Sequence, residues 1–80
     1  MTEHEKYRDR LIRVGLNIAY HRKYKNFTQQ ELADTIKMSR DFIAKVEAPD
    51  VFTSVSLKTL FKVADALDMP PYKLLDFRDE

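Results

Sequence analysis

Two short groups of apolar residues, each at helical spacing, lie next to one another near the middle of the chain. The first group consists of Leu32, Ala33 and Ile36, and the second of Phe42, Ile43 and Val46. Because residues three and four apart share one face of a helix, each group predicts a short amphipathic helix. The intervening Lys37-Met38-Ser39 is long enough only for a tight corner, so the pattern predicts two helices joined by a turn.

Polar residues predict where these two helices begin. Thr28 has Glu31 three residues later, which is the spacing of a capping box. Ser39 can cap the second helix, and Asp41 then lies in its first turn, where the positive end of the helix dipole favours an acid. The two helices and their corner are therefore predicted to occupy residues 28–47.

A long helix is predicted before this pair, from about Thr2, with Glu5 as its capping-box partner, to about Tyr24. Its inward stripe comprises Tyr7, Leu11, Gly15, Ile18 and Arg22. The apolar face is widened by Ile12, Leu16 and Tyr20. We interpret the widening as a broad core-facing surface, and a partner-binding surface is the alternative.

Two more helices are predicted after the pair. The fourth extends from about Ser56 to Leu67, and its expected inward residues are Leu57, Leu60, Phe61, Ala64 and Leu67. Pro70-Pro71 ends the connection that follows it. The last short helix is expected from Tyr72 to Phe77. All five predicted elements are helices, so the predicted fold class is all-α.

Composition narrows the class of protein. The 80 residues suffice for a single domain, 1–80, with one core. There is no cysteine, and His4 and His21 are too few for a zinc site, so we expect no metal and no cofactor. No apolar run is long enough to span a membrane and no signal peptide is recognisable, so we expect a cytoplasmic protein. The scattered acids, and the lack of a nucleophile beside a base, argue against an enzyme.

The central pair of helices and the residues after it resemble the Xre/Cro-type, or phage-repressor-like, helix-turn-helix transcriptional regulators, over about residues 11–75. The resemblance is carried by Gln29, Glu31-Leu32-Ala33, Ser39-Arg40, Ile43, Glu47, Leu57, Leu60, Ala64 and Ala66-Leu67. It implies a five-helix, phage-repressor-like DNA-binding domain in which helices 2 and 3 form the helix-turn-helix. Residues 1–10 would then be an N-terminal extension that makes the first helix unusually long.

Five residues lie on the side of the second motif helix that its apolar residues leave free, namely Ser39, Arg40, Asp41, Ala44 and Lys45. Such residues can reach base edges in the major groove. Arg40 is the strongest candidate, because its guanidinium can donate two hydrogen bonds to the O6 and N7 of guanine. Asp41 can accept from a cytosine amino group or serve the helix dipole. Lys45 can reach a base or a phosphate. Phe42 is expected to pack at the corner, and an apolar contact to a thymine methyl is the alternative.

A second set of residues is expected to contact phosphates. The resemblance implies that Gln29 binds a phosphate at the start of the first motif helix, beside Thr28. Free N–H groups and the helix dipole favour an anion there. The stretch that contains Lys23, Lys25 and Asn26 precedes this helix and is the most basic part of the chain.

The chain departs from the family pattern at two places. Lys37 stands at the corner where glycine is usual, and the left-handed backbone expected there costs a non-glycine residue roughly 1–2 kcal/mol. The loop after the second motif helix has no basic residue, so its phosphate contacts would come from Thr53 and Ser54. Val51 and Phe52 of that loop are expected to pack inward or against a partner.

The resemblance also implies a structural ion pair between Arg22 and Glu47. Arg22 lies on the inner stripe of the first helix, where an unpaired charge would be costly. A phosphate contact by Arg22 is the alternative, which we disfavour for this reason.

The distribution of charge supports binding to DNA at one end of the molecule. The formal net charge is only +1, but residues 21–47 hold six Lys and Arg against four acids, and residues 48–80 hold four against six. We therefore predict a sequence-specific regulator that binds double-stranded DNA as a homodimer on a palindromic operator, with no membrane or small-molecule partner evident. The alternative is a protein-interaction module on the same scaffold, such as an antitoxin or an antagonist of another regulator, with weak DNA binding.

The end of the chain, residues 70–80, is the predicted dimer interface. Its short helix carries more apolar residues than one core-facing stripe can use, because the adjacent Leu74 and Leu75 cannot both point inward. The members of this predicted interface are Tyr72, Leu74, Leu75 and Phe77.

Overall fold

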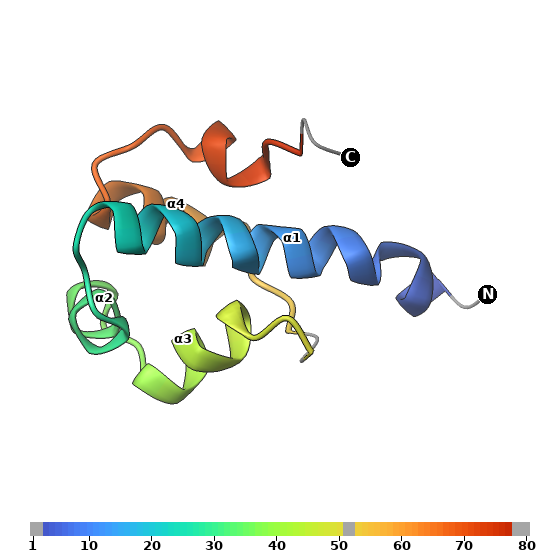
Figure 1. The fold of residues 1–80 in the computed structure, drawn as a ribbon, viewed down its shortest axis with the longest axis horizontal. Coiled ribbons are helices and arrows are strands. Elements are labelled where there is room, and N and C mark those ends of the chain that lie inside the picture. The colour runs from blue at the N-terminus through green and yellow to red at the C-terminus, as the bar shows by residue number, and fades with distance from the viewer. Residues whose placement is uncertain (1–2, 51–52, 78–80) are drawn as a thin grey trace.

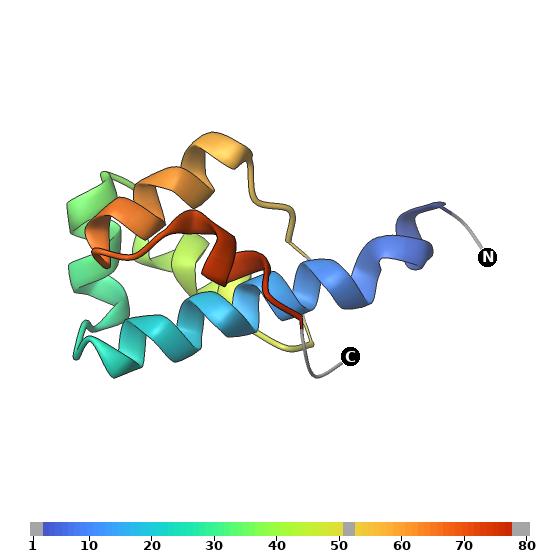
Figure 2. The same cartoon turned by 90° about the horizontal axis from the view of Figure 1, so that it is seen from above.

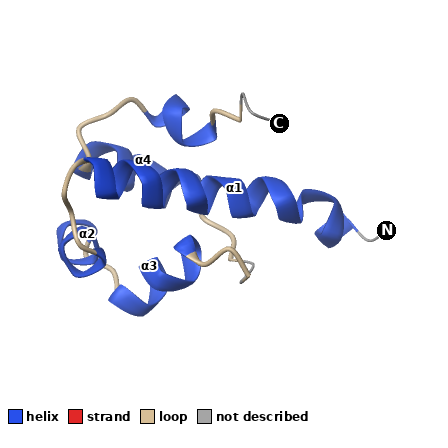
Figure 3. Cartoon of the chain, in the orientation of Figure 1, coloured by secondary structure: helices blue, strands red, loops and turns tan. Residues whose placement is uncertain are grey.

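The computed structural model describes residues 3–50 and 53–77, with side chains from residue 6 onward. Four α-helices, α1 (Glu3–Tyr24), α2 (Gln29–Ile36), α3 (Arg40–Glu47) and α4 (Leu57–Ala66), precede a short 3-10 helix, η1 (Pro71–Leu75) (Figure 1). These described ranges contain no strand, so the predicted all-α class is confirmed for them (Figure 3). The capping box predicted for Thr2 and Glu5 lies outside the described side chains.

The long α1 crosses the molecule, with α3 on one side of it and η1 on the other (Figure 1). Turned by 90°, the structure shows η1 lying between α1 and α4, both of which it contacts (Figure 2). α2 packs against α3 and α4. None of the helices in the described ranges is long and apolar enough to cross a membrane.

Hydroxyl side chains cap the starts of three helices, namely Thr28 for α2, Ser39 for α3 and Ser56 for α4. Each has an extended backbone, and its side-chain oxygen accepts a hydrogen bond from the backbone N–H three residues later. Such a bond satisfies one of the N–H groups that the first turn of a helix leaves without a partner. These caps explain why the start of each of these helices could be predicted from the sequence to within about a residue.

Three helices are followed by a residue in the left-handed conformation, and none of these residues is glycine. Asn26 follows α1 with φ 63°, Lys37 follows α2 with φ 60°, and Asp68 comes shortly after α4 with φ 52°. Asn and Asp adopt this conformation more readily than other non-glycine residues, whereas Lys37 carries the full steric cost. The left-handed corner expected at Lys37 is therefore present.

The core is built from the inward faces of all five elements. Its buried members are Val14, Ile18, Leu32, Ala33, Ile36, Ile43, Val46, Leu60, Val63, Ala64, Leu67 and Leu74. Phe42 and Met38 pack against this cluster, so Phe42 lies at the corner as predicted. At Gly15, α1 approaches α3 so closely that a Cβ atom would overlap the carbonyl oxygen of Val46. Glycine is required there by this contact between two backbones.

Two predictions about which side chains point inward were wrong. Leu57 and Phe61 of α4 are 66% and 49% exposed, because α4 packs through a stripe rotated towards Val63, which is 1% exposed. On α1, Leu16 and Tyr20 are 43% and 64% exposed, so the broad core-facing surface does not include them, and Tyr7, predicted on the inward stripe, is 38% exposed. In both helices only part of the apolar face is buried in the core, and the residues at the edge of that face are exposed to solvent.

The C-terminal element differs from the predicted α-helix at residues 72–77. Pro70 and Pro71 lead into the tight 3-10 turn of η1, in which Leu74 is fully buried. Leu74 therefore belongs to the core and not to a dimer interface, and Phe77 is partly buried and packs against the core. Of the four predicted interface residues, Tyr72 and Leu75 are exposed, at 64% and 48%.

Candidate nucleic-acid interface

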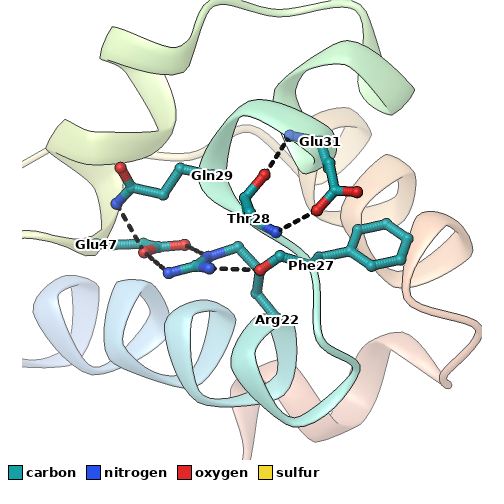
Figure 4. Close-up of polar contacts among 6 residues, drawn as sticks. All are labelled: Arg22, Phe27, Thr28, Gln29, Glu31 and Glu47. Carbon is teal, nitrogen blue, oxygen red and sulfur yellow. Dashed lines mark hydrogen bonds and ion pairs between the residues drawn. The ribbon is translucent and has the colours of Figure 1, made fainter.

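A buried ion pair between Arg22 and Glu47 joins α1 to α3 (Figure 4). The guanidinium donates through Nε to Glu47 Oε2 at 2.7 Å and through Nη2 to Glu47 Oε1 at 2.9 Å. Its Nη1 donates to the carbonyl oxygen of Phe27 at 2.6 Å. Arg22 and Glu47 are 7% and 8% exposed, so the sequence-based expectation of an inward-facing ion pair matches the geometry. Each nitrogen of the guanidinium and both oxygens of the carboxylate thus have a hydrogen-bond partner, which is the condition for burying two charges.

Gln29 adds α2 to this network. Its Nε2 donates to Glu47 Oε1 at 3.0 Å, so the first residue of α2 is attached to the last residue of α3 (Figure 4). An amide Nε2 carries two hydrogens, and this bond uses one of them. The second hydrogen remains for an acceptor outside the molecule, such as a phosphate oxygen.

The start of α2 presents further donors. Thr28 Oγ1 accepts from the N–H of Glu31 at 3.0 Å, and the Glu31 carboxylate accepts from the N–H of Thr28 at 2.8 Å. Hydrogen bonding of the Glu31 carboxylate to the backbone N–H of Thr28, and to a smaller extent to its side chain, lowers the pKa of Glu31 below its ordinary value. The N–H groups of Gln29 and Gln30 belong to the orphan donors of a first helical turn, which favour a bound anion.

α3 presents a polar face opposite its buried side. Ile43 and Val46 are 1% and 5% exposed, whereas Arg40 and Lys45 are exposed and make no ion pair with any described residue. The other candidates on this face are Ser39 and Asp41, both exposed, and Ala44, which is half-buried. The hydroxyl oxygen of Ser39 accepts from the N–H of Phe42 at 3.1 Å, so its main role in the structure is capping.

The remaining phosphate candidates lie in two connecting segments. Lys23, Lys25 and Asn26 are exposed at the end of α1, before α2. In the loop between α3 and α4, Thr53 is half-buried and Ser54 is exposed. Val51 and Phe52, expected to pack inward or against a partner, lie outside the described residues.

Three contacts that position this site were not predicted. The bond from Gln29 to Glu47 depends on the angle between α2 and α3, which the sequence does not contain. Asn17 Nδ2 donates to the carbonyl oxygens of Leu74 and Asp76, at 3.0 and 3.2 Å, and so attaches η1 to α1. One indication of the close approach at Gly15 was present in the sequence, because the chain's single glycine lies on the inward stripe of α1.

No group of three or more His, Asp or Glu residues in the described ranges could hold a metal ion. The site therefore consists of hydrogen-bond donors and cations on a helical scaffold. This arrangement can bind an anionic polymer by charge and can discriminate bases by directed hydrogen bonds.

Comparison with known proteins places these features in a family. The Helix-turn-helix family model matches residues 18–74. The chain is 30% identical over 67 residues to the HTH-type transcriptional regulator SinR of Bacillus licheniformis, a match that covers 84% of this chain and 60% of that protein.

Solved structures give the same result. The restriction-modification controller protein C.AhdI from Aeromonas hydrophila has a TM-score of 0.73 and 31% identity, covering 80% of this chain and 94% of that chain. A structure of SinR, the master regulator for biofilm formation, in complex with DNA has a TM-score of 0.71 and 30% identity. The match covers 79% of this chain and 98% of that chain. A hypothetical transcription factor, NHTF, from Neisseria has a TM-score of 0.74 and 28% identity. The match covers 84% of this chain and 73% of that chain. The chain belongs to the Xre-type helix-turn-helix family of phage-repressor-like transcriptional regulators.

Proposed function

We propose that this chain binds double-stranded DNA in a sequence-specific manner, with α3 in the major groove, and that it acts as a homodimer on a palindromic operator. The observation that carries the proposal is the way α3 is held. Its apolar side is buried, its last residue is bound to α1 and α2 through Glu47, and Arg40 and Lys45 extend from its free side. A rigid helix with exposed donors is what base reading requires.

Phosphate contacts would fix the orientation of α3. The free hydrogen of the Gln29 amide and the N–H groups at the start of α2 can donate to one phosphate. Because Gln29 is also bonded to Glu47, a phosphate held there would set the position of α3 relative to the DNA backbone. Lys23 is exposed at the end of α1 and would add a second phosphate contact. The family's relation to DNA-binding regulators supports a binding role, exercised in the cytoplasm, and not an enzymatic one.

We place the dimer interface on the exposed side of η1. A 3-10 helix has three residues per turn, so Tyr72 and Leu75 lie on one face. Both are exposed and apolar, whereas Leu74 between them is buried. Pairing of two copies through this face about a two-fold axis would give the symmetry of a palindromic operator, with half-sites about 34 Å apart.

Selection of bound sequences from a random DNA pool tests the proposal. We expect an enriched inverted repeat whose half-sites contain a guanine. If no sequence is enriched even at low salt, the chain is instead a protein-interaction module, such as an antitoxin or an antagonist of another regulator.

The dimer has its own test. Leu75→Glu should give a folded monomer by sedimentation whose helicity survives but whose affinity for the palindrome falls. Leu74→Glu is the contrasting variant and should unfold the chain, because Leu74 is in the core. A wild type that is monomeric at tens of micromolar, where a weak dimer would be visible, would contradict the assigned interface.

A further inference from the structure

A groove lined by cationic and aromatic side chains lies between the C-terminal part of α1 and the segment from α4 to η1. It has a volume of about 340 Å³. Because η1 and α3 lie on opposite sides of α1 (Figure 1), this groove lies away from α3, and it shares only Lys25 with the candidate phosphate contacts. Neither the fold nor base reading requires it.

One wall of the groove is aromatic. Tyr20 and Tyr24 of α1 stack with ring centroids 6.4 Å apart and an angle of 19° between the rings. The rings of His21 and Tyr20 are nearly perpendicular, with ring centroids 5.0 Å apart and an angle of 86° between the rings. Met69 and Pro70 line the groove as well and add an apolar surface. Stacked tyrosines that are 64% and 73% exposed present a large, rigid area, which is typical of residues that anchor a partner.

The charges in the groove are mostly positive. Lys25, directly after α1, and Lys73 of η1 line it beside His21, and Asp68 is the single acid among the lining residues. The pKa of His21 is lowered by burial, and then by the positive charges of Lys73 and Lys25. Because the positive charges of Lys73 and Lys25 both act on His21, the three side chains lie near one another, and the two lysines favour an anion at this place.

The shape of the groove favours a peptide over a small molecule. Small-molecule sites cover roughly 70–90% of their ligand, and a wall of tyrosines exposed to 64% and 73% is too shallow for that. We propose that the groove binds an acidic peptide segment of a partner protein. An apolar side chain of the segment would lie against Tyr20 and Tyr24, and its carboxylates would be held by Lys25, Lys73 and His21.

The proposed dimer leaves this groove accessible. Successive residues of a 3-10 helix are about 120° apart, so Lys73 lies on a different face of η1 from Tyr72 and Leu75. A peptide in the groove and a second copy on the exposed face of η1 could then be bound at the same time.

A phage-displayed library of random short peptides, selected on the full wild-type chain, tests the proposal. We expect enrichment of peptides that combine Asp or Glu with an apolar or aromatic residue. Lys73→Glu should weaken a selected peptide by about tenfold or more, as expected when a charge at an interface is reversed. Tyr20→Ala should weaken it as well. Lys58→Glu, which makes the same charge change at an exposed site on α4 outside the groove, should not.

Two further measurements distinguish peptide binding in the groove from nonspecific attraction between charges and from DNA binding. On addition of a selected peptide, the pKa of His21 measured by NMR should rise, because carboxylates beside the imidazole favour its charged form. Lys73→Glu should leave affinity for the selected DNA unchanged. The proposal is overturned if no acidic peptides are enriched, if Lys58→Glu weakens them as much as Lys73→Glu, or if Lys73→Glu weakens DNA and peptide alike.

Discussion

Removal of the Glu47 carboxylate is the perturbation that the structure predicts most sharply. Glu47→Ala leaves Nε and Nη2 of Arg22 without their acceptor, in a residue that is only 7% exposed in the wild type. It also removes the acceptor of the Gln29 amide. The bond from Arg22 to the carbonyl oxygen of Phe27 remains, so the guanidinium is held in place as a stranded charge.

The size of the stability loss in Glu47→Ala follows from the burial of the stranded charge. Removing one partner of a buried pair typically costs about 3–5 kcal/mol. A domain of this length has a free energy of unfolding of about 4–12 kcal/mol, so Glu47→Ala should remove a large share of it. The melting temperature should fall by roughly 10 °C or more. Asp41→Ala, which removes an exposed acid from the same helix, should cost less than about 1 kcal/mol.

Urea denaturation followed by circular dichroism measures these differences. The decisive comparison is a double-mutant cycle with Arg22→Met, which removes the charge and keeps an apolar stem. Because Arg22→Met relieves the stranded charge, the double variant should be more stable than the sum of the single losses, with a coupling of about 2 kcal/mol or more. Losses that add without coupling would refute the pairing of Arg22 and Glu47.

Three more predictions concern local geometry. Gly15→Ala should destabilise the fold by about 1–3 kcal/mol in thermal denaturation, because its Cβ would meet the carbonyl of Val46, and an unchanged midpoint would argue against this contact. Lys37→Gly should raise the free energy of unfolding by about 1 kcal/mol, since glycine adopts φ 60° without the steric cost, and a loss would refute strain at the corner. The lowered pKa of Glu31 means that its carboxylate stabilises the fold above its ordinary pKa and loses this effect as the pH falls through the lowered value. Glu31→Gln, which removes the titrating carboxylate, should therefore reduce the pH dependence of stability in this acidic range, and an unchanged profile would exclude the capping box as its source.

The positions of the helices could be predicted from the sequence because the signals are local. Thr28 and Ser39 cap the first turn that follows them, and apolar spacing defines the inward side of α2 and α3. The pairing of Arg22 with Glu47 was also accessible, because a charge on an inward stripe needs a partner and the family resemblance named one.

The orientation of α4 and the form of η1 could not be predicted, because each depends on packing between elements. Two overlapping stripes are possible on α4, and contact with α2 and η1 selects the one centred on Val63 instead of Phe61. In η1, burial of Leu74 and the bonds from Asn17 fix a 3-10 turn at residues 71–75, where the sequence predicted a fifth short helix at residues 72–77. These contacts join residues 57 and 59 positions apart, so no local pattern indicates them.

Base reading in the proposed complex depends on Arg40, which we expect to bind a guanine from the exposed side of α3. The most direct test of this contact measures the affinity of the wild type and Arg40→Ala for the selected operator, with the candidate guanine intact or replaced by 7-deazaguanine, which lacks the N7 acceptor. A bidentate contact is worth about 1–3 kcal/mol, so either change alone should weaken binding. We predict that the base change costs the Arg40→Ala variant almost nothing more, because the hydrogen bond to N7 is already absent. Equal losses from the base change in both proteins would contradict the assignment of Arg40 to base reading.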